Sequence, residues 1–143
     1  MMRFHKLNNY NEKMNQEFSD IAYSGFMQHN GGLQFREISK SDYEYKTTVK
    51  EIHLNSSGNT HGGFVVSFLD SGMGTAAHRA LGPNVKAATI SLDVKFISGS
   101  RAGDILIGSA KVLQRTRSLV FMQGEVKCGK QLISTAEGIW KVL

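Results

Sequence analysis

The sequence has few of the features that stabilise secreted proteins or bind metals. Its 143 residues include a single cysteine, Cys128, which cannot form an internal disulfide. No group of cysteine and histidine residues has the spacing of a zinc site. The segment Met1–Phe18 mixes charged and amide side chains and lacks the apolar centre of a signal peptide. We therefore expect a cytoplasmic protein without a bound metal.

Long apolar runs and runs of one charge are also missing. The longest apolar stretch, Gly62–Ala77, contains Asp70 and two serines and is shorter than the roughly 20 residues that cross a bilayer. The net charge is +5, but the basic residues are scattered, with no run of five or more. A nucleic-acid-binding surface would need a clustered basic face or stacking aromatic residues. We expect neither a membrane nor a nucleic-acid partner.

The spacing of apolar residues predicts an opening helix over Asn11–Gln28. Its apolar face would contain Met14, Phe18, Ile21, Ala22 and Phe26. The helix should end near the Gly31-Gly32 pair, because glycine supplies the backbone conformation that stops a helix.

A second helix is predicted over His61–Leu81, and it is apolar around most of its circumference. Such a helix belongs in the protein interior. Gly72 and Gly74 each weaken an isolated helix, so we expect another segment to pack very close to this backbone. A short buried strand over Val65–Leu69 is the alternative interpretation.

The remaining patterns predict strands. Glu44–Ile52 places Tyr45, Thr47, Val49 and Glu51 on one side of a strand. After Lys86 apolar residues alternate with polar ones, and the expected buried face consists of Ala88, Ile90, Leu92, Val94 and Phe96. Turns separate three further strand-like runs: Asp104–Leu113, Leu119–Cys128 and Leu132–Val142.

This order of elements predicts an α+β fold in which a curved antiparallel sheet wraps a long central helix. We expect one domain over residues 1–143, with 1–30 as an N-terminal helical segment and 31–143 as the core. A single sheet leaves one edge or face incompletely covered, so a homodimer is expected.

The candidate chemistry lies at the start of the central helix. Asp70 is the sole ionisable residue between His61 and His78, and an interior carboxylate is normally hydrogen-bonded, protonated or functional. Gly62 and Gly63 stand where backbone N–H groups have no partner within the helix, so a substrate can approach these amides closely. Together they suggest an oxyanion site and a base that activates water. A structural carboxylate and an ordinary helix entry remain the alternatives.

These residues also carry a resemblance to a known family. The motif is Asn55-x-x-Gly58-x-x-His61-Gly62-Gly63-x-x-x-x-x-Leu69-Asp70. With the strand Thr89–Phe96 and the turn Ala102-Gly103-Asp104, it resembles the hotdog-fold acyl-CoA thioesterases of the phenylacetate-degradation type. The similarity extends from about Tyr43 to the end of the chain.

The resemblance implies a role for each matching residue. Asp70 would be the catalytic carboxylate, as general base or nucleophile, and Gly62 would donate its N–H to the thioester carbonyl. Asn55 and His61 would position the carbonyl group or the water, and Thr89 would hold the water beside the carboxylate. The family builds each site across a dimer, often within a dimer of dimers, so Asn55, His61 and Gly62 would face Asp70 and Thr89 of the other subunit. No cofactor is implied, since coenzyme A is part of the substrate.

Two features bear on coenzyme binding. Family members often carry an Asn before the aromatic residue that ends the strand and an Arg-Pro pair after it, whereas this chain has Lys95 before Phe96 and then Ser98-Gly99. Basic residues in or beside predicted turns are candidates for contacts with the coenzyme A phosphates; they are Arg115, Arg117 and Lys130. Ordinary solvated loop charges are the favoured alternative interpretation of these residues. A non-catalytic acyl-CoA-binding module is the alternative function, which an internal carboxylate disfavours.

Overall fold

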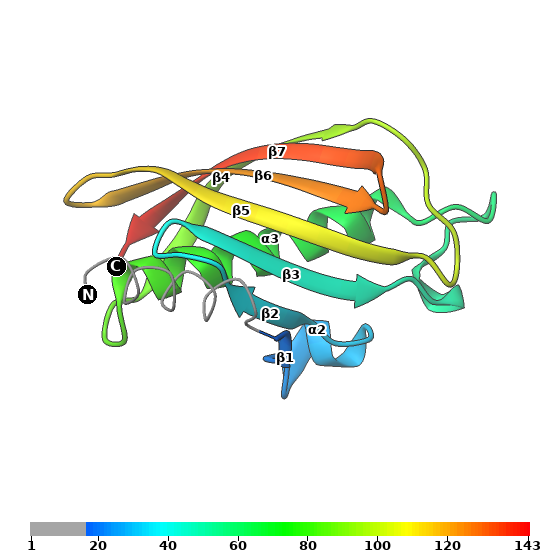
Figure 1. Cartoon of the computed structure of the whole chain (residues 1–143), viewed down its shortest axis with the longest axis horizontal. Helices are drawn as coiled ribbons and strands as arrows, with labels where there is room; N and C mark the ends of the chain where they lie inside the picture. The colour runs from blue at the N-terminus through cyan, green and yellow to red at the C-terminus, as the bar shows by residue number, and fades with distance from the viewer. Residues whose placement is uncertain (1–16) are drawn as a thin grey trace, which may run out of the picture.

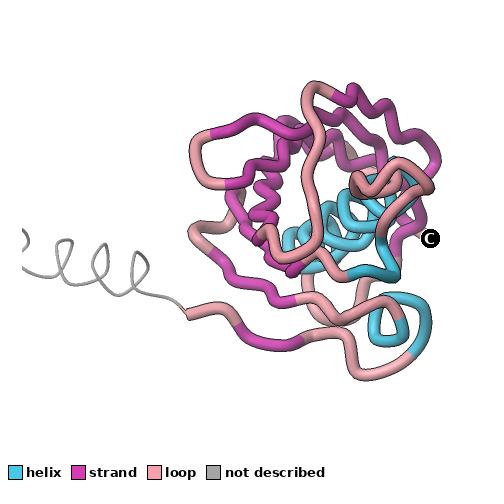
Figure 2. The backbone as a smooth tube through the Cα atoms, turned by 90° about the vertical axis from the view of Figure 1, so that its right-hand side faces the viewer, coloured by secondary structure: helices cyan, strands magenta, loops and turns pink. Residues whose placement is uncertain are grey.

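In the computed structural model, which describes residues 17–143, one antiparallel sheet curves around the long helix α3 (Figures 1 and 2). The strands are β1 Ser19–Asp20, β2 Gln34–Glu37, β3 Asp42–Thr48, β4 Ala87–Phe96, β5 Ile105–Arg115, β6 Leu119–Cys128 and β7 Gln131–Val142. The helices are α2 Gly25–His29, the short 3₁₀ helix η1 Glu51–His53, and α3 Gly62–Leu81. The sheet order is β1-β2-β3-β5-β6-β7-β4. The predicted fold class, a curved antiparallel sheet wrapped around a central helix, is confirmed.

Short turns explain most of this topology, because they join neighbouring antiparallel strands. A turn at residues 116–118 joins β5 to β6, and the Gly129-Lys130 turn joins β6 to β7. The chain between β3 and β5 contains α3 and β4, and β4 pairs with β7 at the edge of the sheet. The start of α3 therefore lies next to the end of β4, where Gly62 meets the Phe96 ring.

The opening helix is only partly as predicted. Residues 11–16 lie outside the described part of the chain. Residues 17–24 are not helical, because Ser19–Asp20 pairs with β2 as strand β1, and the helix itself is the single turn Gly25–His29. It ends where predicted: Gly31 and Gly32 have φ angles of 104° and 86°, which favour glycine.

The glycines of α3 accommodate aromatic side chains, as expected. The Tyr45 ring is completely buried in a slot between Gly72 of α3 and Gly108 of β5, and a Cβ atom at either glycine would overlap this ring. Phe68 closes the slot with an edge-on contact, at 4.7 Å between ring centroids. At Gly74 the nearest side-chain atom is Nε1 of Trp140. These contacts fix the helix against the sheet.

Gly72→Ala is therefore expected to lower the free energy of unfolding by about 2–3 kcal/mol, because the added methyl group overpacks the core. Urea unfolding of the purified protein measures this change. Gly74→Ala is the matched control: its Cβ atom would lie 3.3 Å from Trp140 Nε1, and alanine favours the helix by about 1 kcal/mol. Equal stability of the two variants would contradict the proposed slot for Tyr45.

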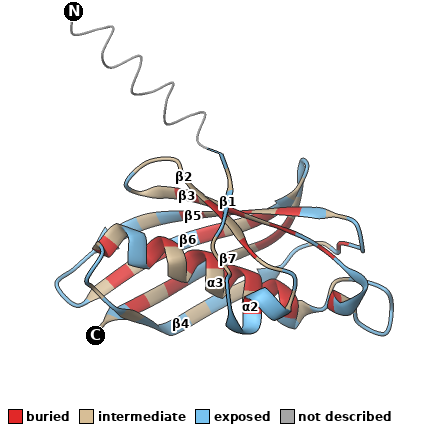
Figure 3. Cartoon of the chain, turned by 90° about the horizontal axis from the view of Figure 1, so that it is seen from below, coloured by how far each residue is buried: buried red, intermediate tan, exposed pale blue. Residues whose placement is uncertain are grey.

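Strand β4 is the exposed edge of the sheet, and none of its residues is buried (Figure 3). Its apolar face differs from the predicted one. Leu92 and Val94 pack on the core, but a register shift between Thr89 and Ser91 reverses the alternation, so Ala87 packs inward while Ile90 is 56% exposed. The prediction was therefore wrong for Ala88 and Ile90, and also for Phe96, which is exposed at the end of the strand. The shift decides where Thr89 points.

Candidate active site

The first turn of α3 presents an unused backbone donor. His61 is the N-cap residue, and its Nδ1 atom accepts the N–H of Gly63 at 2.8 Å. The N–H of Gly62 has no acceptor among residues 17–143. Gly62 is half-buried, and the positive end of the helix dipole adds to the potential at this point. The turn can therefore stabilise negative charge that develops on a carbonyl oxygen.

Two polar side chains, one at the N-cap of α3 and one in the preceding loop, are oriented by hydrogen bonds from backbone N–H groups. Because Nδ1 of His61 accepts a hydrogen bond, the neutral ring carries its proton on Nε2, which is available to donate. Asn55 uses Oδ1 to accept the N–H groups of Ser57 and Asn59, at 3.0 and 3.1 Å, and so shapes the loop that leads to α3. Its side-chain NH₂ group remains as a second donor. Both residues are exposed.

The carboxylate of Asp70 accepts a hydrogen bond from the Thr89 hydroxyl at 2.8 Å. Asp70 lies on α3 and is half-buried, so its side chain is not sealed inside the core. Thr89 reaches it because of the register shift after this residue: strict alternation from Leu92 would have turned Ile90 toward the helix instead. One carboxylate oxygen is held by Thr89, and the other can meet water.

Within one chain the two groups are too far apart to act together. Gly62 and Asp70 are separated by eight residues of α3, which corresponds to about 12 Å along the helix axis. The hollows that border the start of α3 contain Gly62 or its neighbours His61 and Gly63, but not Asp70. The chain thus brings Asp70 and Thr89 together, while His61 and Gly62 stand at the helix start and Asn55 lies in the loop that precedes it.

Comparison with known proteins identifies the family. Residues 57–134, which include Gly62, Asp70 and Thr89, match the family model described as Thioesterase superfamily. The chain belongs to the thioesterase superfamily. A Pseudomonas aeruginosa protein named as a presumed esterase, PA0474, is 27% identical over 92 residues, which cover 64% of this chain and 69% of that protein. The predicted family and activity class, thioester hydrolysis, are confirmed.

Solved structures agree on the fold. A variant of the phenylacetic acid degradation protein PaaI from Thermus thermophilus superposes with a TM-score of 0.74 at 24% identity, covering 82% of this chain and 98% of that one. A hypothetical thioesterase from Streptococcus pneumoniae, solved with coenzyme A, gives a TM-score of 0.71 at 17% identity, covering 78% of this chain and 85% of that one. The thioesterase described here therefore has the hotdog fold.

The three basic residues proposed for coenzyme contacts do not form one cluster in the thioesterase chain. Arg115 is the last residue of β5. Across the sheet it pairs with Val120 of β6, which pairs with Trp140 of β7, which pairs with Thr89 of β4. Arg115 and the nearby Arg117 therefore lie at the end of the sheet that carries Thr89 and Asp70. Lys130 lies in the turn at the other end of β6, about 30 Å away for a ten-residue strand. One subunit cannot bring all three to the same phosphate group.

His78 and Cys128 have structural surroundings. Nδ1 of His78 donates to the Gly74 carbonyl at 2.8 Å, and Nε2 accepts the Ala87 N–H at 3.2 Å, so the ring ties α3 to the start of β4. Both ring nitrogens are thereby occupied. Cys128 is a half-buried residue at the end of β6. Among residues 17–143, neither side chain is hydrogen-bonded to Asp70 or Gly62.

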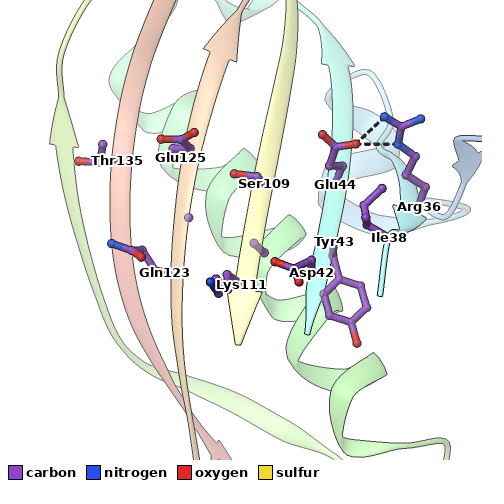
Figure 4. A pocket seen from close by; sticks show the side chains of 12 residues that line it. Arg36, Ile38, Asp42, Tyr43, Glu44, Ser109, Lys111, Gln123, Glu125 and Thr135 are labelled. Atoms are coloured by element: carbon purple, nitrogen blue, oxygen red, sulfur yellow. Dashed lines mark hydrogen bonds and ion pairs between the residues drawn. The ribbon is translucent and has the colours of Figure 1, made fainter. Parts of the chain in front are cut away.

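A hollow of about 670 Å³ lies on the outer face of the sheet, with α3 behind the strands (Figure 4). Small residues such as Ala110 and Gly124 form its floor, and charged side chains surround it, including the ion pair between Arg36 and Glu44. No residue of α3 lines it, so this hollow is separate from the helix start and from Asp70.

Sequence patterns missed His53, which supports the active-site turn. It is 3% exposed; Nδ1 accepts the Lys50 N–H at 2.9 Å, and Nε2 donates to the Asn30 carbonyl at 2.6 Å. Its ring stacks on Phe64 of α3 at 3.7 Å, and its carbonyl accepts the His61 N–H at 2.8 Å. His53 thus joins α2, η1 and the start of α3. Its position between two apolar residues gave no sign of these bonds.

His53 should make the stability of the thioesterase sensitive to acid. Burial lowers the pKa of His53 below its ordinary value of 6.5; the bond to the Asn30 carbonyl opposes this shift and the charge of Lys50 adds to it. The unfolded chain therefore binds the proton first, and the free energy of unfolding should fall as pH drops below about 6.5. Urea unfolding at pH 7.5 and 5.5 tests this. His53→Gln should reduce the difference, whereas His29→Gln, at an exposed position, should leave it unchanged. If the free energy of unfolding changes by the same amount between the two pH values in His53→Gln and in His29→Gln, the proposed role of His53 is contradicted.

Between residues 17 and 143, no three His, Cys, Asp or Glu side chains are grouped in a way that could hold a metal ion. In the same part of the chain, no helix is both long enough and apolar enough to cross a membrane.

Proposed function

We propose that the thioesterase hydrolyses acyl-CoA thioesters to the free acid and coenzyme A, in an active site shared by two copies of the chain. The main support is the pair of half-sites: a half-buried carboxylate held by a hydroxyl at 2.8 Å, and a free backbone N–H at a helix start. The structural relative from Streptococcus pneumoniae that was solved with coenzyme A supports the choice of leaving group.

In this mechanism the thioester carbonyl oxygen accepts the N–H of Gly62, while Asn55 and His61 Nε2 offer further donors. Asp70 and Thr89 of the second copy approach the other side of the carbonyl carbon. Asp70 takes a proton from water as the water oxygen attacks, and the negative charge on the carbonyl oxygen is stabilised by Gly62. When the C–S bond breaks, the proton passes to the departing thiolate. The protein supplies every catalytic group, so we propose that no cofactor is needed.

Direct attack by Asp70 is the other route, in which its carboxylate forms an anhydride with the acyl group and water then cleaves it. A single turnover in H₂¹⁸O detects the second route when water attacks the aspartyl carbonyl of the anhydride; attack at its acyl carbonyl labels the product acid, as general-base catalysis does. General-base catalysis places one ¹⁸O atom in the product acid. Attack by Asp70 followed by hydrolysis at the aspartyl carbonyl leaves the first product acid unlabelled and places the label in the enzyme.

We propose that the second copy pairs along β4. This edge strand is open, and Ile90, Phe96 and the adjacent Ile97 are all more than half exposed. In a two-fold symmetric, antiparallel pairing, the Phe96 end of one β4 meets the Thr89 end of the other. Since Gly62 contacts Phe96 and Asp70 contacts Thr89, the pairing would place each Gly62 opposite the partner copy's carboxylate.

The same pairing would bring Lys130 of one copy to the end of the sheet where the other copy carries Arg115 and Arg117. These residues are then candidates for binding the coenzyme A phosphates across the dimer. A dimer of dimers is proposed through the outer face of the sheet. The floor of small residues in its hollow allows close approach, and its Arg36, Lys111, Glu44 and Glu125 side chains provide both signs of charge for a self-complementary contact.

The proposed function is tested by following free thiol release from acetyl-, hexanoyl-, decanoyl- and phenylacetyl-CoA. We expect turnover of at least one member of this panel, with saturation in acyl-CoA concentration. Tight binding of acyl-CoA without thiol release would instead favour a non-catalytic acyl-CoA-binding module. Absence of both binding and turnover would refute the proposed substrate class.

A further inference from the structure

Two hollows border the start of α3: Gly62 lines one of them, and its neighbours His61 and Gly63 line the other. The first, which we name the α2 hollow, has a volume of about 330 Å³ and is lined by Phe26, Ile52, Leu54, His61, Gly63 and Phe64, among others. The second, the β4 hollow, has a volume of about 360 Å³ and includes Thr60, Gly62, Phe96, Ser98 and Ser100. A thioester whose carbonyl oxygen is bound by Gly62 must extend its two arms in different directions.

The α2 hollow offers an apolar surface. Phe26 and Ile52 are 64% and 69% exposed beside it, which is unusual for two large apolar side chains that face the same hollow. Its back wall is fixed, because the His53 ring stacks on Phe64 and is held at both nitrogens. The lining also includes Asn30, His53 and Ser67, so it is Phe26 and Ile52 that offer exposed apolar surface to a hydrocarbon group.

The β4 hollow has a mixed lining. The hydroxyl residues Thr60, Ser98 and Ser100 stand beside the apolar residues Val65, Phe96, Ile97 and Ile133. Phe96 and Ile97 belong to the open edge at which the second copy is proposed to pair, which leaves the α2 hollow for the acyl group. Ser98 donates to the carbonyl of Leu132 at 2.5 Å, so this hollow adjoins the turn that carries Lys130. The pantetheine arm of coenzyme A contains amides and ends in phosphates. The β4 hollow provides polar partners and a nearby cation for that arm.

We infer that the α2 hollow binds the acyl group of the substrate, and that Phe26 and Ile52 determine the preference of the thioesterase for large apolar acyl groups, whether alkyl or aryl. This inference rests on the proposed acyl-CoA hydrolysis. The acetyl group is too small to reach Phe26 and Ile52, whereas decanoyl and phenylacetyl groups extend beyond the first carbon atoms and contact these side chains.

The test compares kcat/KM for acetyl-, decanoyl- and phenylacetyl-CoA in wild type, in Phe26→Ala and in Ile52→Ala. Each variant should lose about tenfold in kcat/KM for whichever of the two larger substrates the wild type prefers, and almost nothing for acetyl-CoA. Inhibition by free coenzyme A should be unchanged. Leu113→Ala, which removes an apolar side chain that is 49% exposed on β5, is the matched control.

If the ratio of kcat/KM between the larger substrates and acetyl-CoA is unchanged in both variants, the inference is overturned. Weaker inhibition by free coenzyme A in the variants would also overturn it, and would assign the α2 hollow to the coenzyme. Either result leaves acyl-CoA hydrolysis by the wild type intact, so the inference can fail while the proposed function stands. A variant with little turnover can be compared by binding instead. The ligand is a ketone analogue of acyl-CoA, in which a methylene group separates the carbonyl from the sulfur so that it is not hydrolysed, and its affinity is compared for large and small acyl groups.

Discussion

Asp70→Asn is expected to lower kcat for thioester hydrolysis about 1,000-fold, with a much smaller change in KM. The asparagine side chain has nearly the same shape and still accepts the Thr89 hydroxyl, so the fold and the hydrogen bond should remain. It cannot accept a proton from water or attack a carbonyl carbon. Free thiol release under saturating acyl-CoA measures the effect, and urea unfolding shows whether stability is kept.

Thr89 provides matched controls for this prediction. Thr89→Ser keeps the hydroxyl that donates to Asp70 and should retain most activity. Thr89→Ala removes that donor and should cost about tenfold, because the carboxylate loses its orientation rather than its charge. Turnover of Asp70→Asn at the wild-type rate would show that this carboxylate has a structural role.

Gly62→Pro is expected to lower kcat about 100- to 1,000-fold, the loss typical of removing one oxyanion donor. Proline has no N–H, but the first position of a helix tolerates it because this N–H has no partner within the helix. The residue before it is also compatible: His61 has a ψ of 133°, in the extended region that proline requires of its predecessor. The substitution therefore removes the donor while leaving α3 intact.

Gly62→Ala separates the donor from the bulk of the side chain. It adds a Cβ atom 3.3 Å from the Phe96 ring, as proline does, but keeps the N–H. With the same acyl-CoA as substrate, we expect kcat to change little in Gly62→Ala and to fall strongly in Gly62→Pro. Equal losses in the two variants would indicate crowding at Phe96 and not a missing hydrogen-bond donor.

The sequence predicted the elements that have strong local patterns. The near-complete apolar surface of His61–Leu81 identified the central helix, and Leu119–Cys128 matches β6 at both ends. Gly72 and Gly74 indicated a close neighbour, which the structure identifies as Tyr45 at one glycine and Trp140 at the other. The family motif, rather than the periodicity, singled out Thr89 as the neighbour of Asp70, and the structure places the two in contact.

Features that depend on pairing between distant segments were not predictable. A register shift at Ile90 is decided by the match between β4 and β7, and an alternating pattern carries no sign of it. The segment at residues 19–20 forms a strand because β2 offers an edge, although its apolar spacing resembled a helix. The distance between Arg115 and Lys130 follows from the length of β6 between two turns that look alike in sequence.

The central claim is that Gly62 and Asp70 act on the same thioester from different copies of the chain. Co-expression of Asp70→Asn and Gly62→Pro, followed by isolation of the mixed assemblies, tests it most directly. An isolated mixed dimer has one intact site of two, so thiol release should recover to about half of the wild-type rate. Activity no higher than that of the two variants measured separately would contradict the shared site.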